Sequence, residues 1–191
     1  MTNDRLPDYI KPSNYTILFE PNLKEFTFKG KETITISVSK SAKQIFLHAL
    51  DLKIKSLSVS QESAISSKFS NKNGQLAINL IRPLNQGEAE IKIEFEGKIN
   101  DNLNGFYRSK YKDKNGNEKY LATTQFEAPY ARKAFPCFDE PNKKATFDIT
   151  LEIDSDLKAV SNMPILSETK KENKKIINFQ QTPIMSTYLL Y

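Results

Sequence analysis

An apolar side chain at every second position is the dominant pattern of this sequence. Within residues 146–153, Phe147, Ile149 and Ile153 alternate with polar residues, and residues 33–38 and 91–96 repeat the pattern. Because successive side chains of a strand point to opposite faces, each segment is predicted to be a β-strand with one buried and one solvated face. Weaker forms of the pattern predict further strands at residues 15–20, 25–28, 44–48, 52–60, 76–80, 158–162, 175–180 and 186–191.

Turn signals separate these strands at short intervals. Asn73-Gly74, residues 85–87 and residues 113–116 are typical of hairpin turns, and the last should join strands at 105–111 and 118–125. Many short strands of this kind predict an all-β fold, an antiparallel sandwich or saddle, that forms one domain over residues 1–191. The exception is residues 128–137, where Pro129 favours a short helical turn near 129–134.

The scarcity of metal ligands and nucleophiles excludes most kinds of catalytic site. The 191 residues include one histidine, His48, and one cysteine, Cys137. A zinc site takes three or four ligands, mainly from these two residue types, so no metal site is expected. There is no G-x-S-x-G motif and no phosphate-binding glycine loop, so no catalytic residues are assigned; a cysteine–histidine hydrolase would require the two residues to meet. A single cysteine excludes an internal disulfide and predicts a reducing, cytoplasmic location.

The charge pattern argues against nucleic-acid and membrane partners. The net charge is +5, but only four of the 28 basic residues are arginines and the lysines alternate with acids. A nucleic-acid surface usually clusters its basic residues. No apolar run is long enough to span a bilayer, and residues 1–10 lack the apolar core of a signal peptide. The densest cluster, at residues 170–175, is interpreted as a solvated hairpin tip, with a polyanion site as the alternative.

One stretch resembles a known family closely. It runs from Thr124-Gln125-Phe126-Glu127-Ala128 through residues 132–141, which read R-K-A-F-P-C-F-D-E-P. Supporting segments lie on both sides of this stretch and keep the family's order: residues 5–7 with 12–15, 28–30, 45–49, 145–148, 161–164 and 185–189. Together they resemble the N-terminal domain of the aminopeptidase-N family of zinc metallopeptidases, from about residue 5 to residue 191.

This resemblance implies a saddle-like β-sandwich domain that packs on a separate thermolysin-like catalytic domain. It also implies that residues 1–191 form a single such domain and end abruptly within its last strands. The catalytic domain would hold the zinc, on an H-E-x-x-H helix that this chain lacks. The parent enzyme would remove N-terminal residues from peptides, with zinc polarising the scissile carbonyl. The 191-residue chain alone is therefore predicted to be inactive.

The resemblance also assigns two substrate-binding residues. It implies that Glu127 pairs with the free α-amino group of a peptide and that Gln125 contacts the first residue of the substrate. The chemistry is reasonable, because a carboxylate recognises a cationic amine through a charge-assisted hydrogen bond, whereas a carboxamide offers both a donor and an acceptor. Without the resemblance, both residues would be ordinary polar residues at the end of a hairpin.

The neighbouring motif residues are interpreted as structural. Arg132 facing Asp139 and Glu140 would fix the shape of the loop. The remaining motif residues are expected to pack in the core or to form structural hydrogen bonds: Phe126, Phe135, Phe138, Cys137 and His48.

An alternative function stays open beside the enzyme domain. A stand-alone module could bind peptides or proteins, or associate with itself through open sheet edges and an exposed apolar face. The apolar ending at residues 185–191 favours such pairing. The predicted partners are therefore peptide N-termini, a catalytic domain in cis or in trans, or a second copy.

Overall fold

A computed structural model of the chain describes residues 5–60, 65–70 and 74–191, with only the backbone described for 65–70. It is built of strands, together with two short 3-10 helices. The strands are β1 (Ile10–Asn22), β2 (Thr27–Val38), β3 (Ala42–His48), β4 (Lys53–Val59), β5 (Ile65–Ser70), β6 (Gln75–Leu84), β7 (Gly87–Lys98), β8 (Gly105–Lys112), β9 (Glu118–Gln125), β10 (Thr146–Asp154), β11 (Ile165–Lys171) and β12 (Lys174–Phe179). The helices are η1 (Ala131–Lys133) and η2 (Thr187–Leu189).

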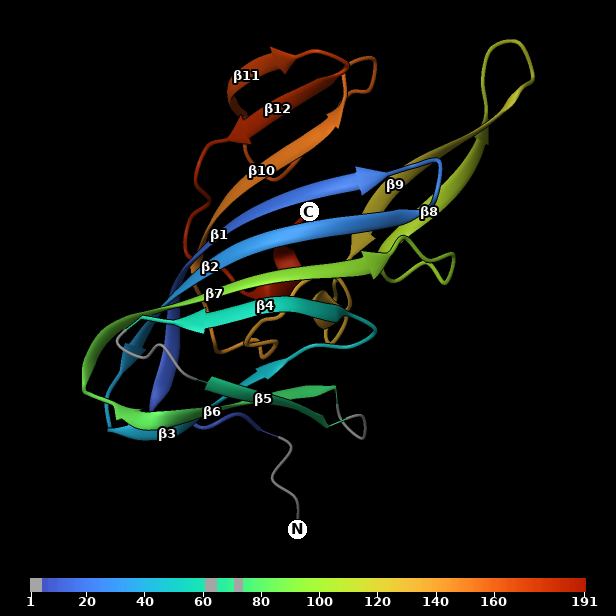
Figure 1. The fold of residues 1–191 in the computed structure, drawn as a ribbon. Coiled ribbons are helices and arrows are strands. Elements are labelled where there is room, and N and C mark those ends of the chain that lie inside the picture. Colours follow the sequence, from blue (N-terminus) through green and yellow to red (C-terminus); the bar gives the residue numbers. More distant parts are fainter. Residues whose placement is uncertain (1–4, 61–64, 71–73) are drawn as a thin grey trace.

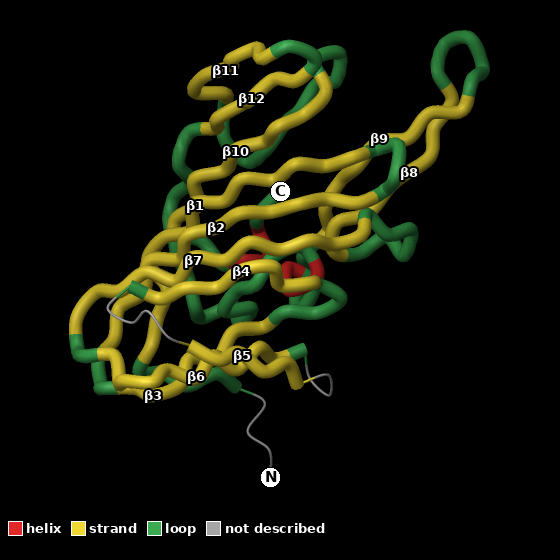
Figure 2. The backbone as a smooth tube through the Cα atoms, viewed as in Figure 1, coloured by secondary structure: helices red, strands yellow, loops and turns green. Residues whose placement is uncertain are grey.

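The strands form three sheets (Figures 1 and 2). A twisted seven-stranded sheet has the order β11-β12-β10-β1-β2-β7-β4, and a three-stranded sheet has the order β3-β6-β5. The third is the two-stranded ribbon β8–β9, which projects from one end of the large sheet (Figure 1). The predicted all-β, sandwich-like fold is confirmed. One pairing differs from the antiparallel expectation, because β1 and β10 run parallel and are joined by a long connection through the other strands.

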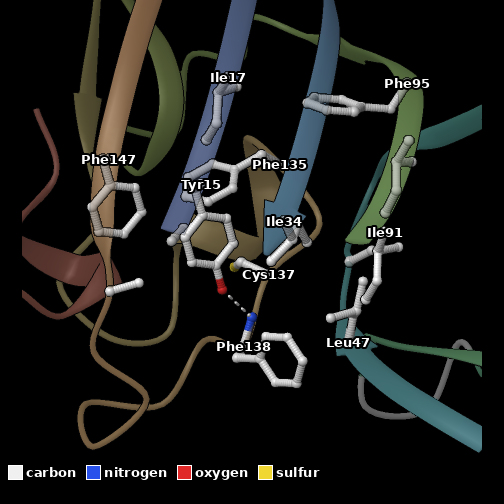
Figure 3. Close-up of a cluster of buried hydrophobic side chains, with 14 of the residues drawn as sticks. Tyr15, Ile17, Ile34, Leu47, Ile91, Phe95, Phe135, Cys137, Phe138 and Phe147 are labelled. Carbon is white, nitrogen blue, oxygen red and sulfur yellow. Dashed lines mark hydrogen bonds between the residues drawn. The ribbon is translucent and has the colours of Figure 1, made fainter. Parts of the chain in front are cut away.

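The core lies on the inner face of the large sheet. Strand alternation directs Tyr15, Ile17, Ile34 and Ile91 inward, where they meet the loop that carries Phe135 (Figure 3). All five side chains are fully buried, as the period-two pattern predicts.

Two glycines make room for aromatic rings between β2 and β7. Gly30 lies opposite Phe95, and Gly97 lies opposite Phe28, in the same pair of strands. A Cβ atom at Gly30 would lie 2.2 Å from the Phe95 ring, and one at Gly97 would lie 2.3 Å from the Phe28 ring. Each ring therefore covers the glycine on the neighbouring strand. Both ends of the F-x-G sequence at residues 28–30 take part, because Phe28 covers Gly97 and Gly30 leaves room for Phe95.

Two predicted strands are wrong. Residues 158–162 are irregular, and residues 186–191 contain η2 instead of a strand. These segments bind each other through side chains: Asn162 donates to the Leu189 carbonyl, and Ser161 donates to the Tyr191 carbonyl. Side-chain hydrogen bonds of this type compete with a sheet ladder, so the alternation at these residues does not produce a strand.

The hairpin β11–β12 differs from the prediction in two respects: β11 was not expected, and Lys175 is buried instead of solvated. β11 was not predicted, since all of its side chains are exposed and its sequence does not alternate. Lys170 and Lys171 are exposed near the turn, as expected for a solvated tip. Lys175 is buried, however, because it shares the inward face of β12 with Ile177 and Phe179, and its amino group lies 3.5 Å from Glu168. The predicted turn at Asn73-Gly74 begins outside the described residues.

Candidate functional site

The ribbon β8–β9 positions the first predicted site residue. Gln125 is the last residue of β9 and pairs with Gly105, the first residue of β8. The hairpin predicted at 105–111 and 118–125 is therefore confirmed. Cross-strand partners share a face of a ribbon, so Gln125 lies on the same face as Thr123, Leu121 and Tyr107.

Phe126 anchors the two predicted site residues to the core. Its ring is buried, with its centroid 5.9 Å from that of Phe135. Gln125 before it is half-buried, and Glu127 after it is exposed. Neither of these polar side chains makes a hydrogen bond or an ion pair within the described residues. Phe126 therefore fixes the backbone on either side of it, and both polar side chains are available to bind a group outside the domain.

The loop after Glu127 is fixed by a buried cluster around Asp139. The predicted helical turn is present as η1, and Arg132 within it donates from Nε to Asp139 Oδ2 at 2.8 Å. Thr187 donates to the other carboxylate oxygen at 2.9 Å. The Asp139 side chain is 1% exposed and that of Arg132 is 14% exposed, so this is a buried ion pair. The Asp139 cluster, Arg132–Asp139–Thr187, therefore connects the loop with the C-terminal segment.

Glu140 and Lys143 tie the same loop to the N-terminal segment. Glu140 Oε1 accepts from the Leu6 amide at 2.6 Å. The buried Lys143 amino group lies 2.9 Å from both the Pro7 carbonyl and Asp8 Oδ1. The interpretation that residues 132, 139 and 140 fix the shape of the loop is confirmed, although Glu140 does so by accepting a hydrogen bond from the Leu6 amide. Thr187 and Lys143 were missed, because their partners are 48 and 135 residues away and nothing local in the sequence marks them.

His48 and Cys137 do meet, but they do not form a catalytic pair. They form an isolated antiparallel bridge with two backbone hydrogen bonds, of 2.7 and 2.9 Å. Nδ1 of His48 accepts from the Asp139 amide, and burial together with Arg132 lowers the pKa of His48 to about 4. Cys137 is fully buried, and burial raises the pKa of its thiol well above the usual value, the opposite of an activated nucleophile. The structural roles predicted for both residues are confirmed.

An apolar surface lies next to Gln125 on the same side of the ribbon. Thr123 contacts the Tyr191 hydroxyl at 3.4 Å, which brings the C-terminal segment against β9. Tyr188, Leu189 and Tyr191 of that segment are exposed, and together we call them the C-terminal face. Large exposed aromatic and aliphatic side chains in one region are typical of an interaction surface.

The outer face of the large sheet carries a shallow trough of about 510 Å³. It is lined by hydroxyl groups and by an ion pair, Lys31 with Glu94, and contains none of the predicted site residues. Across residues 5–60 and 74–191, no three histidine, cysteine or acidic side chains gather into a metal-binding group. Within the described part of the chain, no helix is long and apolar enough to cross a membrane.

Comparisons with known proteins agree with the fold and the motif. Residues 11–189 match the model of the peptidase M1 N-terminal domain. The chain is 42% identical to a puromycin-sensitive aminopeptidase of Caenorhabditis elegans over 98% of the chain and 20% of the relative. It is 43% identical to an alanine/arginine aminopeptidase of Saccharomyces cerevisiae over its whole length and 23% of the relative.

An aminopeptidase N of Canis lupus familiaris is 40% identical over 97% of the chain and 21% of the relative. The chain thus spans about a fifth of the length of these relatives, and its match is to their N-terminal domain. The all-β fold, the T-Q-F-E segment and the Asp139 cluster lie within this match. The chain belongs to the peptidase M1 family as an N-terminal domain.

Proposed function

We propose that this chain is the substrate-amine-recognising domain of a zinc-dependent aminopeptidase. The observation that supports the proposal most directly is the state of Glu127. It is an exposed carboxylate without an internal partner, on a loop that Phe126 and the Asp139 cluster hold in place. Because the backbone that carries this carboxylate is fixed, binding a cation needs to order only the Glu127 side chain.

The free α-amino group of a peptide is the cation that this carboxylate would bind. A charge-assisted hydrogen bond between the two distinguishes a peptide N-terminus from an internal peptide bond, which carries no positive charge. Gln125 lies two residues earlier, with its carboxamide available for the backbone or side chain of the first substrate residue. This division of roles explains specificity for N-terminal residues.

The catalytic apparatus would lie in another domain, which packs on the C-terminal face. The residues of this chain do not fit a zinc site, because its one histidine and its one cysteine are both buried in backbone pairing. The relatives are about five times longer than this chain, which leaves ample length for a catalytic domain. The C-terminal face adjoins Gln125, so a domain docked there would place its reactive groups beside the amine-binding residues.

If the domain acts alone, the C-terminal face would have a second function as a binding surface. Leu189 and Tyr191 would then bind a peptide or a second copy of the chain. A lone, buried cysteine suits a reducing compartment, so we place either form in the cytoplasm.

The mass of the native protein separates the two functions. Detection with an antibody against this domain, followed by intact mass measurement, should show a species several times larger than 21.9 kDa that contains zinc. A native species of 21.9 kDa would contradict the enzyme and leave the stand-alone module. Sedimentation of that module with and without a Tyr191→Ser substitution would then test self-association.

A further inference from the structure

Glu32 lies in the middle of the apolar core. It is on the inward face of β2, where its neighbours across the sheet are Ile17 on β1 and Ile93 on β7. Both isoleucines are buried, as is Ile34 on the same face of β2, and Glu32 itself is only 4% exposed. The alternation of β2 therefore directs a carboxyl group into a position where the other strands have aliphatic side chains.

Neither carboxyl oxygen of Glu32 has a hydrogen-bond partner within the described residues. An isolated carboxylate is too costly to bury, so a carboxyl in such a place is held in the neutral form. In agreement, burial raises the pKa of Glu32 well above its usual value. Two largely buried cations of the loop, Arg132 and Lys143, are paired with other carboxylates, those of Asp139 and Asp8.

We propose that Glu32 acts as a proton sensor of this domain: it folds as a neutral acid, and folding near neutral pH takes up one proton from solvent. In the unfolded chain, the same carboxyl is exposed and ionised above about pH 4.5. Each pH unit above that value therefore shifts the equilibrium about tenfold towards the unfolded state, until the folded carboxyl also ionises.

One other buried group opposes this effect at lower pH. His48 has a folded pKa of about 4 against 6.5 in the unfolded chain, so the unfolded state binds more protons and stability rises with pH between these values. The two slopes cancel from about pH 4.5 to 6.5. Tyr15 and Cys137, which also face the core near Glu32, have raised pKa values and contribute only above about pH 9. The slope from Glu32 is thus isolated above about pH 6.5, until the folded carboxyl ionises.

Urea unfolding of the 191-residue chain between pH 5 and 9 tests the proposal. The folding equilibrium constant of the unmodified chain should be level to about pH 6.5 and should then fall, by about tenfold per pH unit until the folded carboxyl ionises. Glu32→Gln, a neutral isostere, should remove the fall above pH 6.5 and expose the rise from His48 below it. The matched control Glu94→Gln changes a carboxylate on the outer face of the sheet, paired with Lys31, and should keep the fall.

Carbon NMR of glutamate carboxyl groups in the unmodified chain gives a second measurement that needs no variant. One glutamate resonance should stay at its acid position well above pH 4.5. If every glutamate titrates below pH 5.5, or if Glu32→Gln keeps the fall above pH 6.5, the proposal is wrong.

Discussion

Replacing Asp139 with alanine should destabilise the domain severely. The carboxylate accepts from Arg132 at 2.8 Å and from Thr187 at 2.9 Å, and its side chain is almost fully buried. Asp139→Ala leaves the guanidinium in the interior without this partner. Breaking a buried ion pair in this way costs about 3–5 kcal/mol.

A loss of that size is a large part of the total stability, which is about 5–15 kcal/mol for a domain of ordinary size. Thr187→Val removes only the second hydrogen bond and should cost about 1–2 kcal/mol. In the Asp139→Ala background, Thr187→Val should cost close to nothing, since its acceptor is already gone. The surface pair Arg108–Asp101 provides the matched control, because Asp101→Ala breaks an exposed ion pair and should cost less than about 1 kcal/mol.

Urea unfolding followed by far-ultraviolet circular dichroism measures all four variants, since the chain has no tryptophan for fluorescence. A loss of stability in Asp139→Ala no larger than that in Asp101→Ala would refute a stabilising buried ion pair at Asp139. Thr187→Val and Asp139→Ala losses that simply add would refute the coupling of the two residues, because the hydroxyl would then act independently of the carboxylate.

Three further outcomes follow from the packing and the buried groups. Gly30→Ala should lower the free energy of unfolding, measured in urea, by about 1–3 kcal/mol, because the new methyl group overlaps the Phe95 ring. In a Phe95→Leu background the same substitution should lower it by less. An equal loss in both backgrounds would contradict the overlap. Cys137 should not react with a thiol reagent in the native chain and should react fully in urea; rapid native labelling would show that the thiol is not buried. Stability should fall by up to about 3 kcal/mol between pH 6.5 and 4 in a Glu32→Gln background, as the unfolded His48 takes up a proton, and a His48→Gln substitution should remove this fall.

The local alternation of apolar and polar residues is sufficient to predict most of the strands of this fold. β2, β7 and β10 each bury one face of a regular alternation, and the sequence shows that alternation directly. β11 has no buried face, so its sequence carries no period and it could not be found. Residues 158–162 alternate but bind the C-terminal segment through side chains, and this contact is not visible in the sequence.

Only part of the candidate site could be predicted from the sequence, again because many of its contacts join residues that are distant along the chain. Gln125 and Glu127 carry no pattern that distinguishes them from other polar residues at a strand end, and a resemblance to a family was needed to assign them. The contact between Asp139 and Thr187 joins residues that are 48 positions apart, which only the folded chain brings together. The inward position of Glu32, by contrast, follows from the alternation of β2 and was open to inference.

The amine-recognising role that we propose for Glu127 can be tested directly in the longer aminopeptidase that we propose carries this domain. Glu127→Gln removes the charge and keeps the shape, and Glu25→Gln changes an exposed glutamate of the β1–β2 turn as a control. Loss of a hydrogen bond between charged groups, about 1.5–3 kcal/mol, predicts that kcat/KM for a peptide with a free α-amino group falls about 10- to 150-fold in Glu127→Gln and is unchanged in Glu25→Gln. An unchanged kcat/KM in Glu127→Gln would contradict the central claim.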